Sequence, residues 1–176
     1  MLWKHGLLFK LRRLHLHGHI YNFISDFLSS RSISVRVGSC LSSSLAIYNG
    51  VPQGSVLAPI LFILMMNDFP SISDTSISTS LYADDSAIWR VGRNIDHSVR
   101  TIQTRLDSIS FWSSKWGISI NASKTNVVLF TKRCSPPVIN LSINSQPIAS
   151  ATQAKFLGLI FLFQVVLDSS YQLSQK

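Results

Sequence analysis

The sequence contains no glutamate, and all eight of its acidic residues are aspartates. Its two cysteines, Cys40 and Cys134, lie far apart and form no C-x-x-C or cysteine–histidine spacing, so neither a zinc site nor a disulfide-linked partner is expected. We expect both thiols to be reduced in an intracellular protein. Long apolar runs are also missing. The two longest, Val56–Met66 and Phe156–Leu167, are shorter than the roughly 20 residues that span a bilayer, so no membrane partner is expected.

Charged residues make up only 14% of the chain, whereas hydrophobic residues make up 46%, which excludes a disordered linker. The net charge of +8 is unevenly distributed. Residues 1–50 carry six bases and one acid, residues 51–100 three bases and five acids, and residues 101–176 seven bases and two acids. Basic ends around an acidic middle indicate a polyanionic partner held near a carboxylate site.

The first half of the chain alternates helical and extended patterns. Apolar spacing predicts two short helices, over residues 7–14 and 20–28, with a break at Gly18. Apolar and polar residues then alternate over residues 33–37, which predicts a half-buried strand. A strand over Leu45–Tyr48 is expected to pair with it as a hairpin.

Two further helices are expected. The apolar segment Val56–Met66 follows Ser55, a suitable N-cap, and Pro59 lies in its first turn, where a missing N–H is tolerated. The repeat over Ile95–Trp116 predicts an amphipathic helix that ends at Gly117.

The remaining chain is typical of strands and turns. Residues 70–79 form a polar connection, and strands are expected on both sides of Asp84-Asp85 within Leu81–Trp89, and at Val127–Thr131, Val138–Ile143 and Phe156–Phe161. Their spacing favours hairpins over βαβ units. The fold class expected is therefore α+β, with a largely antiparallel sheet and packed helices.

Two adjacent carboxylates, Asp84 and Asp85, lie at the centre of the apolar segment Leu81–Trp89. Like charges this close repel one another unless a cation lies between them. A tight hairpin would bring both carboxylates to one end of the sheet, where Mg²⁺ could take one or two of them. The alternative is a solvent-exposed Asp-Asp turn, since Asp is a common turn residue.

Three other features could contact a ligand, although each also has an ordinary structural explanation. The segment Gly50–Ser55 precedes an apolar helix, and its glycines allow close backbone approach to a phosphate, with Gln53 as a nearby donor and acceptor. Lys124 precedes a strand and could meet a leaving phosphate. His15, His17 and His19 alternate without a further metal ligand, and are interpreted as polar residues beside a basic patch.

The order and spacing of these segments resemble the reverse transcriptase domain of non-long-terminal-repeat retrotransposons, in particular the jockey-like group. Gly50–Pro59 is similar to the family's template- and nucleotide-contacting loop and helix, and Tyr82–Asp85 to its catalytic Tyr-x-Asp-Asp hairpin. Trp116–Thr125 resembles the segment that carries its lysine, and Phe156–Leu159 its primer-grip strand. Trp3–Leu11 is similar to the stretch just after its first catalytic aspartate.

The resemblance covers about residues 1–161, so we expect 1–176 to be a partial reverse transcriptase domain, with 162–176 as a weakly matching tail. It implies a partial polymerase palm with the fingers and thumb largely missing. In the family, the first metal-binding aspartate stands immediately before the position of Met1. We therefore expect Met1 to be an internal methionine of a longer reading frame.

The function that the resemblance implies is that of an RNA-directed DNA polymerase, which uses an RNA template, a DNA primer and deoxynucleoside triphosphates, with Mg²⁺ or Mn²⁺ as cofactor. The implied chemistry is two-metal nucleotidyl transfer. The residues concerned are Asp84 and Asp85 as catalytic metal ligands, Gln53, Gly54 and Lys124 at the nucleotide and template, and Tyr82, Leu157 and Gly158 at the primer. A nuclear location is expected on the same basis.

Two metals need a carboxylate from outside the Asp84-Asp85 hairpin, so the chain alone is expected to have no useful polymerase activity. The lack of a neighbouring strand would leave the edge of Leu81–Trp89 unpaired, from which we expect poor solubility. Two other hypotheses stay open. One is that the chain is a non-catalytic nucleic-acid-binding remnant. The other is that it is a decayed element with no selected function.

Overall fold

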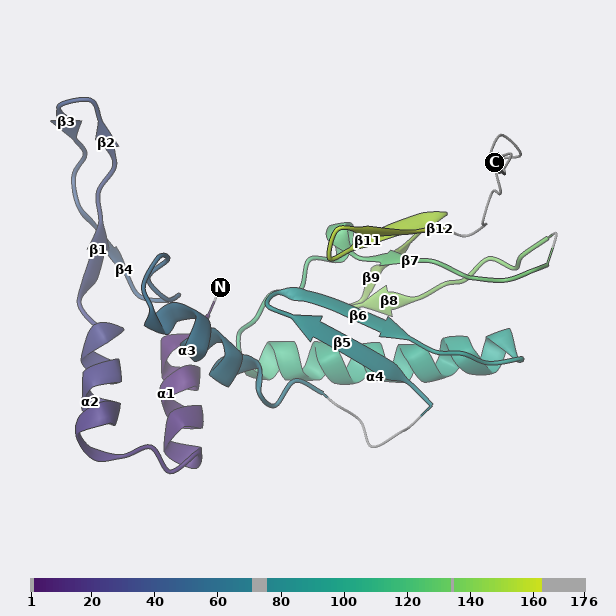
Figure 1. Ribbon diagram of the computed structural model, residues 1–176, viewed down its shortest axis with the longest axis horizontal. Coiled ribbons are helices and arrows are strands. Elements are labelled where there is room, and N and C mark those ends of the chain that lie inside the picture. Colours follow the sequence, from purple (N-terminus) through teal and green to yellow (C-terminus); the bar gives the residue numbers. More distant parts are fainter. Residues whose placement is uncertain (1, 71–75, 134, 163–176) are drawn as a thin grey trace, which may run out of the picture. The chain divides into compact units, whose positions relative to one another are not determined.

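The computed structural model describes residues 2–70, 76–133 and 135–162, and Figure 1 traces its helices and strands. None of the helices in these ranges combines the length and the apolar character needed to cross a membrane. Cys40 is a free, exposed thiol. Cys134 and nearly all of the expected tail, from residue 163 onward, lie outside the described residues.

Two compact units make up the chain, and each is assembled from two separate stretches of sequence. The first unit comprises Met1–Thr75 and Asp107–Ile120. The second comprises Ser76–Leu106 and Asn121–Lys176. Helix α4 (Ile95–Lys115) contributes residues to both units.

The first unit begins with two short helices, α1 (Lys4–Arg13) and α2 (Gly18–Phe27), which confirm the two predicted from the apolar spacing. The break between them lies just before Gly18, which opens α2 with a φ of +69°. Leu7 and Leu11 of α1 are almost completely buried. Burial of this apolar stripe stabilises α1, because a helix of only ten residues has little intrinsic stability in water.

Helix α3 (Leu57–Met66) begins as predicted from Ser55. The Ser55 hydroxyl oxygen accepts a hydrogen bond of 3.2 Å from the backbone N–H of Ala58, which satisfies one of the free donors at the helix start. Every residue of α3 is apolar, but only Ala58, Leu61 and Met65 are buried. Helix α3 therefore packs along one face, although all of its positions are apolar.

Helix α4 ends at the predicted glycine. Gly117 has a φ of +63°, and the N–H of Ile118 donates a hydrogen bond of 2.9 Å back to the carbonyl of Ser113. This arrangement is typical of a helix end closed by a glycine in the left-handed conformation. It turns the chain sharply and keeps Trp116 inside the first unit, where it is 3% exposed.

The core of the first unit is one cluster of buried apolar side chains from all four helices and the start of the chain. Its members are Leu2, Leu7, Leu8, Leu11, Ile24, Leu28, Leu61, Met65, Trp112 and Trp116. Trp112 lies in α4 and Trp116 directly follows it, about one hundred residues after the leucines of α1 that they join. The core of this unit therefore depends on a contact between distant parts of the sequence.

A hairpin arm extends from the end of α2 in the first unit (Figure 1). Strand β1 (Arg31–Ile33) pairs antiparallel with β4 (Leu45–Ile47), which confirms a hairpin to the strand predicted at Leu45–Tyr48. The single strand predicted over residues 33–37 is wrong, because β2 (Arg36–Val37) is separate from β1 and pairs with β3 (Cys40–Leu41). The expected half-burial is wrong, because the described part of this unit leaves the arm open to solvent. Val37, for example, is 74% exposed.

The second unit contains the first half of α4, strands β5 (Ser78–Tyr82) and β6 (Asp85–Trp89), and the segments that follow α4. The Gln103 side chain of α4 exchanges two hydrogen bonds of 3.0 Å with the backbone of Ser142. Its buried apolar residues are Ile77, Leu106, Ala122, Ile139, Leu141, Ile143 and Ile148.

Strands after α4 are shorter than predicted. The expected strand at 127–131 is reduced to β7 (Asn126–Val127), which pairs parallel with β10 (Ala149–Ser150). The one at 138–143 is reduced to β8 (Ser142–Ile143), which pairs with β9 (Gln146–Pro147). Apolar runs of this length extend as strands only where a partner backbone lies alongside, and here the partners are two residues long.

The expected strand at 156–161 is instead a hairpin. Strand β11 (Gln153–Phe156) pairs antiparallel with β12 (Leu159–Leu162), and Leu157-Gly158 forms the turn between them. The sequence did not predict the turn at Leu157-Gly158, because it lies within an apolar run and Leu is rarely a turn residue.

The fold class is α+β, as predicted, but the described strands do not form one sheet. They form six two-stranded sheets, of which five are antiparallel and one, between β7 and β10, is parallel.

Candidate active site

The β5–β6 hairpin brings the two predicted catalytic aspartates to one end of a two-stranded sheet. Its pairing runs from Ser78 opposite Trp89 to Tyr82 opposite Asp85, so Ala83 and Asp84 form a two-residue loop. Ala83 has a φ of +51°, and a positive φ at the first loop residue is common to the two turn types that match strand twist. Local chain geometry therefore places Asp84 in the turn and Asp85 at the start of β6.

Both carboxylates of this pair are exposed, and within the described residues neither takes part in a hydrogen bond or an ion pair. Two negative charges on consecutive residues raise each other's electrostatic energy, and a cation between them removes that repulsion. The hairpin turn thus presents unsatisfied oxygen acceptors to solvent.

Tyr82 accompanies this carboxylate pair. It stands directly opposite Asp85 in the register, so the two side chains lie on the same face of the hairpin. The phenol is 65% exposed. Its ring is therefore accessible to a ligand that reaches Asp85 from that face.

The donor chemistry of this turn fits a divalent cation that prefers oxygen. Mg²⁺ is usually bound through one or two carboxylates and keeps several of its waters. Asp84 and Asp85 supply such a set. The part of the chain that the structure describes contains no group of three or more histidine, cysteine or acidic residues placed to hold a metal, so other ligands would be water, substrate oxygens or residues outside this set.

The Gly50–Ser55 segment belongs to the first unit, where two hydrogen bonds fix the backbone of its first residue, Gly50. The N–H of Gly50 donates a hydrogen bond of 2.7 Å to the carbonyl of Leu2, and its carbonyl accepts one of 2.7 Å from the Arg31 guanidinium. Gln53 and Gly54 are exposed beyond this anchor. Gly54 has a φ of +83°, and a side chain there would meet no neighbouring atom, so its glycine is needed for backbone conformation and not for space.

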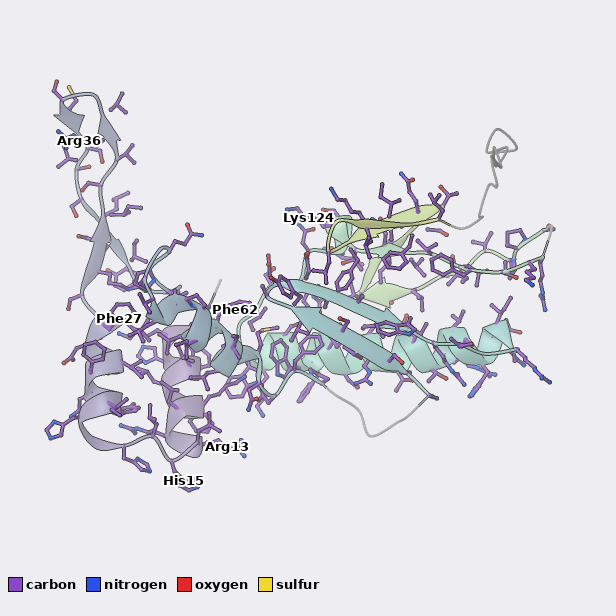
Figure 2. All side chains as sticks on the ribbon, in the orientation of Figure 1. Arg13, His15, Phe27, Arg36, Phe62 and Lys124 are labelled. Atoms are coloured by element: carbon purple, nitrogen blue, oxygen red, sulfur yellow. The ribbon has the colours of Figure 1, made fainter. Side chains whose placement is uncertain are left out.

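Lys124 ends the short 3₁₀ helix η1 (Ala122–Lys124), two residues before β7, as expected for a lysine placed before a strand. The Asn121 side chain accepts a hydrogen bond of 3.0 Å from the N–H of Ser123, and this fixes the turn without using the lysine. Lys124 is exposed, and in the view of Figure 2 it lies toward the end of the second unit at which the β5–β6 hairpin turns.

Leu157 and Gly158, the predicted primer contacts, form the turn of the β11–β12 hairpin. Both have positive φ, +50° and +83°, as in the tight hairpin turn that favours Asn-Gly. A leucine in this conformation is strained relative to asparagine or glycine. The turn is exposed.

The predicted site residues are thus distributed between the two units. Tyr82, Asp84 and Asp85 come together in one turn of the second unit, and Leu157 and Gly158 in another turn of that unit. Lys124 lies on η1, also in the second unit, whereas Gln53 and Gly54 belong to the first unit.

A half-buried ion pair in the first unit, between Lys10 and Asp68, was not predicted from the sequence. Lys10 is only 6% exposed, and its ammonium donates hydrogen bonds to the Asp68 carboxylate and to the carbonyl of Met65. It also lies 4.1 Å from the centre of the Trp116 ring, and Trp112 donates a hydrogen bond of 2.9 Å to Asp68. This cluster joins α1 to α4 and to the C-terminal end of α3.

The environment of this pair shifts both pKa values downward. Burial, together with the charge of Lys115, lowers the pKa of the Lys10 ammonium by more than the hydrogen bond and charge of Asp68 raise it. Burial raises the pKa of the Asp68 carboxyl, but hydrogen bonds from Lys10 and Trp112 together with the lysine charge outweigh this and hold that pKa below its ordinary value. The carboxylate is thus stabilised in its charged form. No signal in the sequence distinguishes these residues from ordinary surface charges.

Comparison with known families identifies one that covers most of the chain. The profile of the family described as "Reverse transcriptase (RNA-dependent DNA polymerase)" matches residues 2–161.

Three curated relatives are similar over 90% of this chain. The RNA-directed DNA polymerase from mobile element jockey of Drosophila funebris is 34% identical over 167 residues, and the polymerase of the same name from Drosophila melanogaster is 33% identical over 165. The probable RNA-directed DNA polymerase from transposon X-element of Drosophila melanogaster is 32% identical over 163. The chain spans 18% of the length of each of these relatives.

Proposed function

This chain belongs to the reverse transcriptase (RNA-dependent DNA polymerase) family, and on that premise we propose that it forms part of the palm of a retrotransposon polymerase. In this proposal Asp84 and Asp85 hold divalent metal ions at the site where a deoxynucleotide is added to a DNA primer on an RNA template. A nuclear location is proposed on the same family basis.

The observation that carries the proposal is the exposed Asp84-Asp85 pair at the β5–β6 turn, without a partner in the described structure. Bound Mg²⁺ or Mn²⁺ would supply activation of the primer 3′ hydroxyl and neutralisation of the departing pyrophosphate. Asp84, in the turn itself, is proposed as the direct ligand. Asp85, one residue further into β6, is proposed as the second ligand or as electrostatic support.

Other residues are proposed to position the substrates. Gln53 and Gly54 would contact the nucleotide and the template, since both are exposed on a segment whose first residue, Gly50, is fixed by a hydrogen bond. Lys124 would neutralise the leaving phosphates, because a lysine ammonium is a compact charge with three donors. Tyr82 would support the primer end on the face that it shares with Asp85.

The β11–β12 turn is proposed to hold the primer backbone. Leu157 and Gly158 both adopt φ values that most residues avoid, and strained backbone is often retained where a ligand is contacted. Its glycine would allow a sugar–phosphate chain to approach closely.

The proposal also sets a limit on the isolated chain. Two adjacent carboxylates are too few to hold two metal ions, since at least one ligand must bridge them from another direction. We therefore expect the 176-residue chain alone to give no product in primer extension with Mg²⁺ or Mn²⁺. Clear extension by this chain would contradict that limit.

The deciding experiment measures primer extension by a longer chain that contains the upstream polymerase segments. We expect Asp84→Asn and Asp85→Asn each to lower kcat by at least about 100-fold, because each removes a charge that faces the metal. Asp96→Asn is the matched control, since Asp96 is an exposed aspartate in the first turn of α4. An Asp84→Asn enzyme that retained the wild-type rate would refute the proposed role.

Primer extension by the longer wild-type chain separates this proposal from a non-catalytic nucleic-acid-binding remnant, for which the net charge of +8 is the favouring observation. Binding by such a remnant would be salt-dependent and independent of sequence, and would survive both substitutions. A longer wild-type chain that binds nucleic acid but never extends a primer would favour the remnant.

A further inference from the structure

The loop between α1 and α2 gathers basic and imidazole side chains at one end of the first unit. Five of them, Arg12, Arg13, His15, His17 and His19, are all exposed, and we call this set the basic loop. Figure 2 labels Arg13 and His15 where α1 turns toward α2. Neither the aspartate turn nor the other proposed substrate contacts include these residues.

The conformation of the basic loop is fixed by contacts of its own. The Arg12 guanidinium lies 4.8 Å from the centre of the Tyr21 ring of α2, which links the end of α1 to the second helix. The His15 and His17 rings meet edge to face at 6.2 Å between centroids. His15 has a φ of +59° and donates its N–H to the carbonyl of Arg12. The loop therefore presents these side chains together and not as a mobile tail.

In the described ranges, no carboxylate pairs with this surface. Within the described residues none of the five side chains forms an ion pair, and the carboxylate of Asp68 is bound by Lys10. Asp26 lies eight residues along α2 from Gly18, about 12 Å away at 1.5 Å per residue. That exceeds the Debye length of about 8 Å at physiological ionic strength, so Asp26 screens the loop weakly.

The helix dipoles do not neutralise the positive charge of the basic loop either. The C-terminus of α1 carries a partial negative charge and the N-terminus of α2 a partial positive one, and these partly cancel where the two ends meet. A structural role remains for Arg12 and Arg13, which stabilise the last turn of α1 by countering its dipole. Such a role predicts an effect on stability, whereas ligand binding predicts an effect on affinity.

We propose that the basic loop is a contact surface for the phosphodiester backbone of a nucleic acid. The two arginines provide fixed charges and fork-shaped donors for phosphate oxygens, and each histidine provides a ring N–H donor even when neutral. The loop lies at an exposed helix–helix turn, and none of its five residues lines the surface hollow of the first unit beside Trp3 and Lys115. An extended polyanion fits such an open surface better than a small phosphate ligand.

This inference rests on the proposed function only in taking a nucleic acid as the partner. It predicts a second anchoring point on the polymerase, in the unit that carries Gln53 and not in the unit that carries Asp84. Its role would be to hold the template or primer strand against dissociation. It takes no part in the chemical step.

The test measures binding of the 176-residue chain to a fluorescein-labelled RNA–DNA hybrid by anisotropy over a range of salt concentrations. We expect Arg12→Gln/Arg13→Gln to bind about tenfold more weakly at 100 mM salt, and to reduce the slope of log affinity against log salt by about 1.4–1.8, as for the loss of two phosphate contacts. The single variant Arg13→Gln, which leaves the Tyr21 contact intact, should show about half that change in slope.

The matched control is Lys132→Gln/Arg133→Gln, which removes the same charge from an exposed pair in the second unit. The inference predicts a smaller effect for this control than for the basic-loop variant. Equal weakening by both double variants would overturn it, because the binding would then follow total charge. So would an unchanged salt slope, or tighter binding to anionic phosphatidylserine vesicles than to the hybrid.

Failure here is distinguishable from failure of the proposed function. Asp84→Asn should keep its affinity for the hybrid and lose primer extension in the longer chain. Unchanged salt slopes combined with loss of extension in Asp84→Asn would reject the basic loop alone. Loss of hybrid binding in the basic-loop variant, combined with normal extension by Asp84→Asn, would reject the catalytic proposal alone.

Discussion

The indole N–H of Trp112 donates a hydrogen bond of 2.9 Å to Oδ1 of Asp68, which lies 44 residues earlier in the chain. The same oxygen accepts a hydrogen bond from the ammonium of Lys10. One carboxylate therefore joins α1, α4 and the residues that follow α3. Because Lys10 is buried, this carboxylate is also the counter-charge that makes the burial of the lysine possible.

Asp68→Ala should lower the free energy of unfolding by about 1–3 kcal/mol. Removing one partner of a fully buried pair costs about 3–5 kcal/mol. We expect the smaller loss of about 1–3 kcal/mol here, because the Asp68 side chain is 47% exposed and solvent screens the interaction. Urea denaturation followed by tryptophan fluorescence gives the value. Asp26→Ala is the control, an exposed aspartate of α2 for which we expect a change within about 0.5 kcal/mol. Equal stability of the two variants would show that the buried pair contributes nothing.

Acid should remove the contribution of Asp68. Its pKa is lower in the folded chain than in the unfolded chain, where it is about 3.9. The stabilisation is therefore complete above the unfolded-state value and is lost as the pH falls through the folded-state value. In Asp68→Asn, which keeps an acceptor but no charge, the stability deficit should be largest above about pH 5 and shrink below about pH 4. A deficit that stays constant from pH 3 to pH 7 would contradict this assignment.

Leu157→Asn should stabilise the β11–β12 hairpin by about 0.5–1 kcal/mol, because asparagine tolerates the positive φ that leucine adopts there. If Leu157 contacts the primer as proposed, the same change should raise the KM for primer in the longer enzyme. The β8–β9 turn provides the reverse control. It uses Asn144 and Ser145 at φ values of +50° and +61°, so Asn144→Leu should destabilise the chain. Leu157→Asn with an unchanged KM for primer would argue against a primer contact at this turn.

The isolated chain should self-associate, because the hairpin arm and the open edges of the two-stranded sheets are exposed in the described structure. Val37 and Tyr48 are 74% and 79% exposed. Val37→Lys/Tyr48→Lys should therefore raise the soluble fraction at least about twofold without lowering the urea midpoint. Sedimentation measures the soluble fraction, light scattering measures self-association against concentration, and tryptophan fluorescence in urea gives the midpoint. Monodisperse wild-type protein at high concentration would contradict the expectation.

Much of the helical structure could be predicted because its signals are local. Ser55 before an apolar run and Gly117 after an amphipathic one mark where α3 begins and α4 ends, and both act as the sequence indicated. The hairpin at Asp84-Asp85 was predictable for the same reason, since two strands separated by two residues allow few arrangements, although its loop is Ala83-Asp84 and Asp85 already pairs with Tyr82 in β6.

What could not be predicted depends on distant partners. Leu157-Gly158 lies inside an apolar run that reads as one strand, and only the pairing of Phe156 with Leu159 makes it a turn. The Lys10–Asp68 pair joins residues 58 positions apart, and each looks like an ordinary surface charge in the sequence. Alternation over residues 33–37 indicates two different faces of a strand, but it does not reveal whether anything covers either face.

The interrupted make-up of the first unit has a consequence for synthesis on the ribosome. Leu7, Leu11 and Leu61 are made early, but Trp112 and Trp116, which complete their cluster, are made last. Trp112 lies 46 residues after Met66, the end of α3, and a segment of that length takes about 2–9 seconds to synthesise at 5–20 residues per second. During that interval the nascent chain presents an unclosed apolar surface. We therefore expect a chaperone that recognises exposed leucines to bind the nascent chain until Trp112 and Trp116 have been synthesised.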